Sequence, residues 1–211
     1  MKKLFSICIL VFALLSGCAS NNAGSRNDNL YDKITGVPGL IAHNSEQGLM
    51  PKGYAQVYVK RAVDGDTLAV IYKGDSLRVR LLDIDTPESV KQGVSAQPYA
   101  KEASNFTRKL VQGEKVKLIF EEGLKDKYGR LLAHVFLKDG TYLNAVLVRN
   151  GYARAEIISP NTVLKDYFLN LQEKAMKNKA GLWSLPQDEQ PFVKNEYGEY
   201  VPRFWLVEDA S

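Results

Sequence analysis

The 211-residue chain has few of the residues used in thiol or imidazole chemistry. Its two cysteines, Cys8 and Cys18, both lie within the first twenty residues. The rest of the chain therefore has neither a disulfide nor a thiolate nucleophile. Its two histidines, His43 and His134, are too few and too far apart in sequence for a histidine-rich zinc or iron site. These absences exclude disulfide-stapled domains, cysteine-dependent enzymes and histidine-rich metalloenzymes.

The first eighteen residues have the pattern of an export signal. Lys2-Lys3 is a short positive region, and the apolar run from Leu4 to Leu15 is too short to span a bilayer as a mature helix. Leu15-Ser16-Gly17-Cys18 then resembles a bacterial lipobox, the signal at which a lipoprotein is cut before a cysteine that becomes acylated. An ordinary signal peptide and an uncleaved anchor are the alternatives.

The lipobox predicts a signal peptide over residues 1–17 and lipidation of Cys18. Several acyl chains hold a protein stably on a membrane, whereas a single chain binds only marginally. The residue after Cys18 is Ala19 and not an aspartate, which resembles the pattern of lipoproteins that are transferred to an outer membrane. We therefore expect a lipid-anchored, extracytoplasmic protein of a bacterial cell envelope, at the outer membrane or the cell surface.

Charge is unevenly distributed along the chain. Without residues 1–17 the chain has 26 Lys/Arg and 24 Asp/Glu, a net charge of +2. Residues 52–183 have a net charge of +7, whereas residues 184–211 have a net charge of −4. The basic part is the candidate binder of a polyanion. Solubility alone is the other interpretation of a moderate positive excess.

The hydrophobic pattern predicts three regions after the signal peptide: a flexible tether over 18–53, a folded domain over 54–183 and an acidic, aromatic tail over 184–211. The tail either packs on the domain or binds a partner. Alternating and apolar runs predict strands over 56–72 (interrupted at Asp64-Gly65-Asp66), 77–82, 116–120, 132–137 and 153–158. Helical spacing predicts helices over 96–111, 142–150 and 162–179. Five short strands with three helices suggest a small β-barrel of the α+β class, with helices closing one end and one side. A barrel of the OB type binds nucleic acids across its strand face.

Three polar clusters stand at predicted strand ends or turns. Asp64-Gly65-Asp66-Thr67 places carboxylates on a kinked backbone, which suits a hard cation that prefers oxygen ligands. The segment from Arg80 to Glu88 combines a phosphate-binding guanidinium with carboxylates, and Asp126 to Arg130 adds a second arginine. Taken singly, each cluster also fits a structural interpretation: an Asp-Gly turn, a charged strand edge and a solvated turn.

Taken together and in this order, the clusters resemble the thermonuclease (micrococcal nuclease) family. The resemblance covers about Val57 to Trp183, including Glu102-Ala103-Ser104 and the terminal Gly181-Leu182-Trp183. It implies an OB-fold and calcium-dependent hydrolysis of DNA and RNA, with little sequence preference, to products ending in a 3′-phosphate. It implies no protein partner, and we expect a monomer.

The resemblance also implies a role for eight residues of this chain. The expected calcium ligands are Asp66, Asp85 and the main-chain oxygen of Thr86. The expected catalytic residues are Arg80 and Arg130 on the scissile phosphate, with Glu88 as general base. The residues expected to contact a terminal phosphate of the nucleotide are Lys127 and Tyr128.

One position departs from the family pattern. The family has a base-stacking tyrosine in the strand before the last helix, and here Glu156 falls nearest to it. Base stacking is worth roughly 1–3 kcal/mol per base, so the mode of nucleotide binding is expected to differ. Asp83 matches no ligand position and is interpreted as structural.

Two alternatives belong to other functional classes. The first is a non-catalytic nucleic-acid-binding or protein-binding module of the same fold, which would need no complete set of acids and arginines. The second is a structural envelope lipoprotein, which would account for the tether and the acidic tail but for none of the three clusters.

Overall fold

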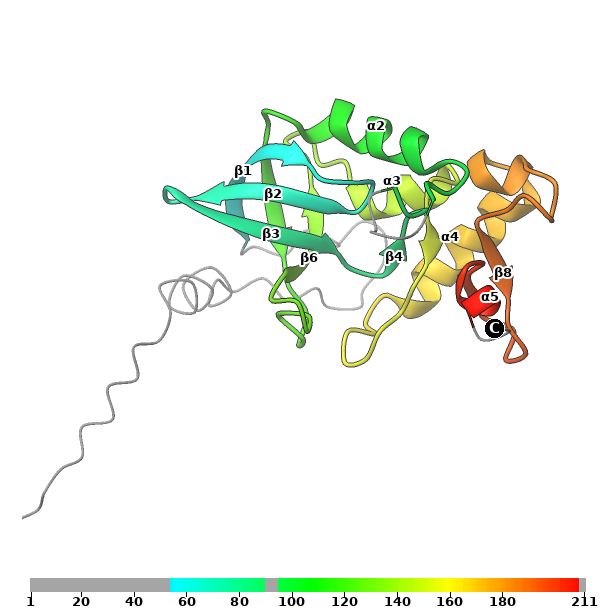
Figure 1. Cartoon of the computed structure of the whole chain (residues 1–211). Helices are drawn as coiled ribbons and strands as arrows, with labels where there is room; N and C mark the ends of the chain where they lie inside the picture. Colours follow the sequence, from blue (N-terminus) through cyan, green and yellow to red (C-terminus); the bar gives the residue numbers. More distant parts are fainter. Residues whose placement is uncertain (1–53, 90–94, 209–211) are drawn as a thin grey trace, which may run out of the picture.

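The computed structural model describes residues 54–89 and 95–208 (Figure 1). Five of its strands close into a barrel in the order β1-β2-β3-β6-β5. They are β1 (Ala55–Ala62), β2 (Thr67–Tyr72), β3 (Asp75–Leu81), β5 (Lys115–Ile119) and β6 (Leu131–Phe136). Neighbours pair antiparallel except β3 and β6, which are parallel. The predicted signal peptide, Cys18 and the tether lie outside the described residues.

The barrel forms because apolar residues alternate along its strands. In β3 the side chains of Leu77, Val79 and Leu81 are buried, whereas the intervening Arg78 is exposed. Successive side chains of a strand point to opposite faces, so one face of β3 enters the barrel core. In β1 the register shifts by a bulge between Val59 and Arg61, which bends the strand at the barrel wall.

Three helices cover the barrel: α2 (Ala100–Val111), α3 (Leu143–Arg149) and α4 (Lys165–Lys177). Helix α2 packs on β1, and α3 packs on both β6 and α4. In Figure 1, α2 runs along the barrel above β1, and α3 and α4 lie beyond the end of β3. The predicted five-stranded barrel with three helices is confirmed.

Helix α2 begins later than the predicted residue 96. Gln97 is held by the loop before it: its N–H donates to the Glu88 carbonyl at 2.9 Å, and its Oε1 accepts the Glu88 N–H at 2.7 Å. Tyr99 then has φ 67°, a left-handed conformation that a helix cannot include. These constraints delay the first helical residue to Ala100.

Helix α4 also begins later than predicted, at Lys165 rather than Thr162. The side chain of Asn161 accepts the Gly123 N–H at 2.7 Å and donates to the Gly123 carbonyl at 2.9 Å. The Val163 N–H donates to the Glu121 carboxylate at 3.3 Å. Side-chain hydrogen bonds thus hold the segment just before α4 against Glu121 and Gly123.

The predicted strand over 153–158 is shorter than expected. Only β7 (Arg154–Ala155) is a strand, paired antiparallel with β4 (Ile84–Asp85). Because β4 has only two residues, the ladder can extend no further. The Glu156 N–H still donates to the Asp83 carbonyl at 3.0 Å, so this residue stays beside the site.

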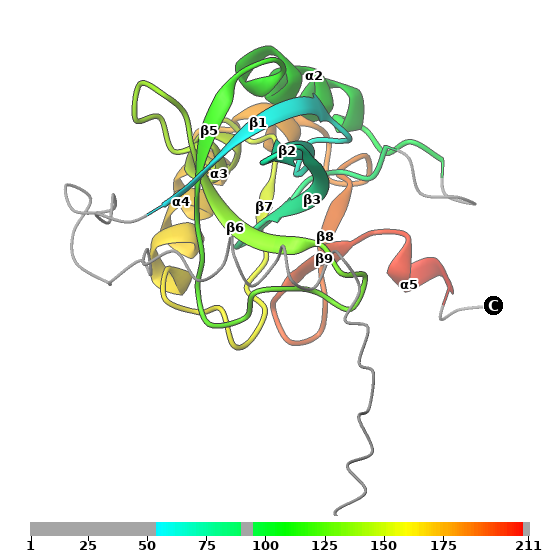
Figure 2. The same cartoon turned by 90° about the vertical axis from the view of Figure 1, so that its left-hand side faces the viewer.

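The acidic tail packs on the domain. It follows η1 (Gly181–Ser184) and contains the hairpin of β8 (Phe192–Lys194) and β9 (Tyr200–Pro202), and α5 (Trp205–Glu208). Phe192 is buried in one cluster with Leu182 and Trp183. In Figure 1, β8 and α5 lie past α4, beyond the end of β3, and Figure 2 shows α5 next to the hairpin of β8 and β9. Across residues 54–89 and 95–208, no helix has the length and apolarity to cross a membrane.

Gly151 fixes the junction of α3 with the tail. The Leu182 N–H donates to the Gly151 carbonyl at 2.8 Å, and Gly151 has φ 68°. A Cβ at this position would lie 1.9 Å from the Ala180 carbonyl oxygen, so only glycine permits this approach.

Candidate active site

The register of the barrel brings the three polar clusters together. Thr67 pairs with Arg80 across β2 and β3, and Arg80 pairs with Leu132 across β3 and β6. Asp66 stands one residue before β2, and Arg130 stands one residue before β6. Segments far apart in sequence therefore reach the same end of the barrel.

These clusters line a cavity of about 370 Å³. All eight residues that the resemblance singled out in the barrel lie on its wall: Asp66, Arg80, Asp85, Thr86, Glu88, Lys127, Tyr128 and Arg130. Their individual roles stay predictions, but the fold gathers every one of them at a single place.

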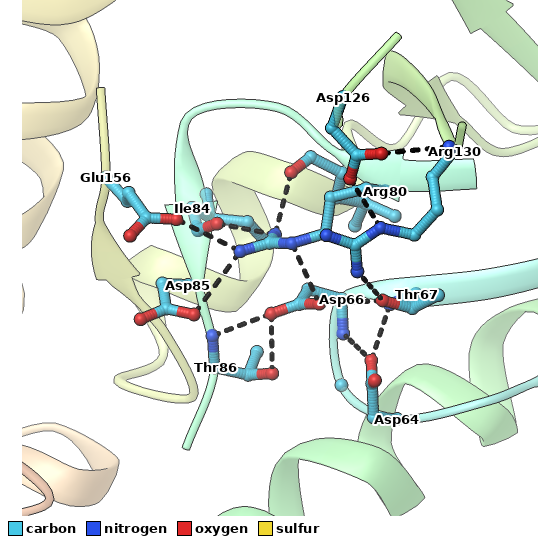
Figure 3. Close-up of polar contacts among 12 residues, drawn as sticks. Asp64, Asp66, Thr67, Arg80, Ile84, Asp85, Thr86, Asp126, Arg130 and Glu156 are labelled. Carbon is cyan, nitrogen blue, oxygen red and sulfur yellow. Dashed lines mark hydrogen bonds and ion pairs between the residues drawn. The ribbon is translucent and has the colours of Figure 1, made fainter. Parts of the chain in front are cut away.

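Asp66 is fixed by hydrogen bonds on both carboxylate oxygens (Figure 3). Its Oδ2 accepts the Thr86 N–H at 2.9 Å and the Thr86 hydroxyl at 2.8 Å. Its Oδ1 accepts the Thr67 hydroxyl at 3.0 Å. Gly65 allows this arrangement, since a Cβ there would lie 2.7 Å from both Cγ2 and Oγ1 of Thr86.

Arg80 is the centre of the cluster, and all three of its guanidinium nitrogens have protein partners. Nη1 donates to the carbonyls of Leu81 at 2.9 Å and Ile84 at 2.7 Å. Nε lies 3.3 Å from Asp66 Oδ1, and Nη2 lies 3.3 Å from Asp85 and 3.1 Å from Glu156, as Figure 3 shows.

The surrounding carboxylates keep Arg80 charged. Burial alone would lower the pKa of this guanidinium, but Asp66, Asp85 and Glu156 more than offset burial and hold the pKa above its ordinary value. The side chain is 12% exposed. A fixed, partly buried cation thus faces the cavity.

Asp85 lies between two arginines. Its Oδ1 is 3.3 Å from Arg80, and its Oδ2 accepts the Arg154 Nε–H at 3.0 Å. Burial and the neighbouring Glu156 carboxylate raise the pKa of Asp85 to about 7, against the two guanidinium groups, which lower it. Glu156 also pairs with Arg154, so Arg154 joins both carboxylates.

The second predicted arginine sits in a hairpin. Arg130 Nε donates to the Asp126 carboxylate at 2.6 Å, and Arg130 Nη1 lies 3.4 Å from the Thr67 hydroxyl. The Arg130 guanidinium also stands over the ring of Tyr128, 5.5 Å from its centroid. The Tyr128 side chain is 72% exposed, so this ring is open to a ligand.

The residues around Arg80 fit a hard divalent cation. The guanidinium groups of Arg80 and Arg154 are surrounded by more carboxyl groups than they can neutralise. The four acids are Asp64, Asp66, Asp85 and Glu156. Burial, followed by the neighbouring Asp66 carboxylate, raises the pKa of Asp64 to about 7. Carboxylates crowded in this way are the ligands that calcium prefers.

Comparisons with known proteins agree with this geometry. Residues 78–185 match the model of the family described as staphylococcal nuclease homologue. The chain belongs to the staphylococcal nuclease family. It is 42% identical over 125 residues to a thermonuclease of Staphylococcus intermedius, an alignment that covers 59% of this chain and 74% of the relative. It is 35% identical over 205 residues to endonuclease YncB of Bacillus subtilis, covering 87% of this chain and 93% of the relative.

A third relative is an endonuclease derived from the SPbeta prophage of Bacillus subtilis. It is 42% identical over 135 residues, which is 63% of this chain and 45% of the relative. These three homologues of this staphylococcal nuclease family member are named as nucleases, which indicates hydrolase activity and a nucleic-acid substrate.

Asp83 is not among the residues lining the cavity. It is buried next to Glu121 and His134. Among the described residues, the potential ligand atoms of these three side chains lie within 4.8 Å of one another, a spacing that could hold a metal ion. His134 Nε2 is 2.9 Å from Glu121, and its Nδ1 is 2.6 Å from the Tyr142 hydroxyl. Burial lowers the pKa of His134 and, together with Glu121, raises the pKa of Asp83 to about 8.

Sequence reasoning missed several residues in the cavity wall of this nuclease-family protein or bonded to it. Arg154 stood in a predicted strand with no signal that it would pair with Asp85. The tail contributes Pro202, Phe204 and Trp205 to the wall. The aromatic composition of the tail was visible, but nothing in the sequence placed it beside Glu88.

Proposed function

We propose that this protein is a calcium-dependent nuclease that hydrolyses phosphodiester bonds of DNA and RNA with little sequence preference and leaves 3′-phosphate ends. The observation that supports this most is the single cavity lined by Asp66, Arg80, Asp85, Glu88 and Arg130. A non-catalytic binding module would need no such complete set of acids and arginines.

In this proposal Arg80 and Arg130 bind the scissile phosphate. Arginine suits this role because its planar fork matches two phosphate oxygens and stays charged at every relevant pH. Arg80 must exchange a carboxylate partner for a phosphate oxygen, and its Nη2 bonds to Asp85 and Glu156 are the exchangeable ones. Its Nη1 bonds to two carbonyls keep the side chain in place meanwhile.

Glu88 takes the proton of the attacking water. The water oxygen then forms a bond to phosphorus, and the bond from phosphorus to the 5′ oxygen breaks. The 5′ oxygen takes up a proton from solvent water and leaves as a hydroxyl, and Glu88 returns its proton to the solvent. Negative charge grows on the phosphate oxygens during this step, and the two guanidinium groups stabilise it. A calcium ion held by Asp66, Asp85 and the Thr86 carbonyl supplies further charge neutralisation when bound.

Contacts to phosphates supply binding energy without reading the base sequence. The proposed activity therefore has little sequence preference, and its KM rises steeply with salt. A calcium site with two carboxylates binds weakly, which suits a compartment rich in calcium.

Degradation of single-stranded DNA by the full-length chain tests the proposal. We expect hydrolysis with excess calcium, none with chelator, and a turnover lower by about 10²–10⁴-fold in Glu88→Gln. Glu173→Gln, an exposed glutamate on α4, is the matched control and keeps wild-type turnover. Binding of DNA without hydrolysis in the presence of calcium would contradict the proposal and favour the non-catalytic module.

We also propose that the protein is a monomer anchored to the cell envelope through lipidated Cys18, outside the cytoplasm at the outer membrane or the cell surface. The lipobox Leu15-Ser16-Gly17-Cys18 supports this. Cys18→Ala is expected to abolish incorporation of labelled palmitate and to release the protein from membranes. Unchanged labelling would exclude Cys18 as the anchor.

A further inference from the structure

The C-terminal tail is bonded to two side chains, Gln97 and Arg154, that also contact Glu88 and Asp85. Gln97 accepts the Glu88 N–H through Oε1 and donates from Nε2 to the Pro191 carbonyl at 3.1 Å. Arg154 binds Asp85 through Nε and donates from Nη1 to the Tyr200 carbonyl at 2.7 Å. The tail is therefore positioned relative to the site by side chains that also contact the site.

The end of the tail is held by a separate set of bonds. The Arg203 N–H donates to the Pro191 carbonyl at 2.8 Å, and its Nε donates to the Gln190 carbonyl at 2.8 Å. The residues that follow, Phe204 and Trp205, are thus presented from an anchored backbone.

These two aromatic residues form part of the cavity wall together with Pro202. The Trp205 side chain is 45% exposed, and its ring centroid lies 6.3 Å from that of Phe204 at an interplanar angle of 89°. Tyr128 and Ile158 are further exposed apolar residues of the same wall. An aromatic face beside two arginines offers a flat apolar surface next to a phosphate site.

Packing alone does not account for the position of Trp205. The aromatic residue that anchors the tail is Phe192, which is 1% exposed and buried with Trp183. Trp205 instead leaves close to half of its surface open at the cavity. Large exposed aromatic side chains next to a polar site are characteristic of ligand contacts.

The residue that stands in place of the family's stacking tyrosine does not serve as a stacking platform. Glu156 is charged and pairs with both Arg80 and Arg154. A nucleotide whose phosphate lies on Arg80 still carries an unstacked base, and every base has a π-face that stacks on an aromatic ring.

We propose that Trp205, backed by Phe204, forms a nucleobase-stacking subsite of the nuclease cavity, so that the C-terminal tail is part of the substrate-binding machinery. This subsite rests on the proposed nuclease function. It accepts any base, because stacking requires no hydrogen-bond readout.

Steady-state kinetics on single-stranded DNA with excess calcium test the subsite. Trp205→Ala is expected to raise KM by about 5- to 100-fold with kcat within about two-fold of wild type. Trp205→Phe keeps an aromatic face and is expected to restore most of the lost affinity. Tyr197→Ala removes a tail aromatic that is 79% exposed and does not line the cavity, so it serves as the matched control.

Tryptophan fluorescence gives a second, non-catalytic readout. The chain has two tryptophans, of which Trp183 is buried and Trp205 is half-exposed. Deoxythymidine 5′-monophosphate, which has no phosphodiester bond to cleave, is expected to quench the wild-type emission and not that of Trp205→Phe. Deoxyribose 5-phosphate, which has the same sugar and phosphate without a base, is expected to leave both unchanged.

The outcomes separate the two proposals. Hydrolysis by the wild type with an unchanged KM in Trp205→Ala would overturn the subsite and leave the nuclease intact. Absence of hydrolysis together with base-dependent quenching of Trp205 would overturn the nuclease and support the subsite. Equal quenching by the two phosphates would show that the base makes no contact, which also overturns the subsite.

Discussion

The two walls of the cavity differ in chemistry and in origin. The barrel wall is charged and comes from strand ends held in register, with Asp66, Arg80 and Arg130 brought together by β2, β3 and β6. The tail wall is apolar and comes from Pro202, Phe204 and Trp205, beyond residues 78–185 that match the family model. The comparison suggests a division of labour in which the barrel performs the chemistry and the tail holds the substrate.

Among the changes that compare the two walls, Arg80→Lys on the barrel wall is expected to have the largest effect. Lysine keeps the charge but loses the fork that spans two phosphate oxygens and two backbone carbonyls. We expect kcat to fall by about 10²–10³-fold, because one donor to the developing charge is lost. Arg78→Lys, an exposed change on the same strand, is the control. A change in KM alone, with kcat unchanged, would show that Arg80 on the barrel wall contributes to substrate binding and not to the chemical step, which contradicts the proposed division.

Much of the barrel wall was predictable because its residues occur in short motifs beside strand ends. Alternating Leu77, Val79 and Leu81 predicted β3, and a barrel follows from several such strands. The partners of these residues were not predictable. Arg154 contacts Asp85 across 69 positions and Glu156 contacts Arg80 across 76, and no local pattern encodes such pairs.

The helix starts and the tail wall escaped prediction for a related reason. Hydrogen bonds of the Gln97 and Asn161 side chains hold the segments just before α2 and α4 outside the helices. Helix propensity does not predict such bonds. The net charge of −4 and the aromatic residues of segment 184–211 left open whether the tail packs on the domain or binds a partner. Net charge and composition do not show that Pro202, Phe204 and Trp205 are the tail residues that line the cavity.

Gly65→Ala is expected to have the second-largest effect on the barrel wall. The new Cβ would lie 2.7 Å from Thr86 side-chain atoms, so Thr86 must move away from Asp66. We expect kcat to fall by about 10–100-fold, and the calcium concentration for half-maximal rate to rise, because small displacements of positioned groups are costly.

Gly74→Asn is the control for this change. Gly74 has φ 92° with open space at its Cβ, and asparagine tolerates a positive φ better than most residues. A calcium titration of Gly65→Ala that overlays the wild type would show that the contact between Gly65 and Thr86 does not shape the site.

Glu156→Gln probes the boundary between the two walls. Unlike the changes above, it is expected to improve substrate binding. The glutamate competes with substrate phosphate for Arg80 Nη2 at 3.1 Å. Removal of its charge is expected to lower the KM for DNA by about 2- to 5-fold at low salt, with a smaller difference at high salt where charges are screened. Glu122→Gln, an exposed carboxylate outside the cavity wall, is the control. A higher KM would show that Glu156 aids binding.

His134→Gln is expected to have the smallest effect on turnover, because His134 is not among the residues lining either wall. Its effect is on stability. Burial lowers the pKa of His134 below its ordinary 6.5, so the unfolded chain takes up a proton near pH 6.5 and the folded chain does not. Stability contributed by the neutral ring is therefore present above pH 6.5 and is lost as pH falls through it, by at most about 1.4 kcal/mol per pH unit.

Glutamine can still donate to Glu121 and accept from Tyr142 but does not titrate. Urea unfolding of the wild type and His134→Gln between pH 8 and pH 5 measures the contribution. Other groups titrate in both proteins, so the difference between the two curves isolates the histidine. We expect the wild type to lose more stability than the variant below pH 6.5. Parallel curves would mean that His134 takes up its proton at the same pH in the folded and the unfolded chain, so that burial does not lower its pKa.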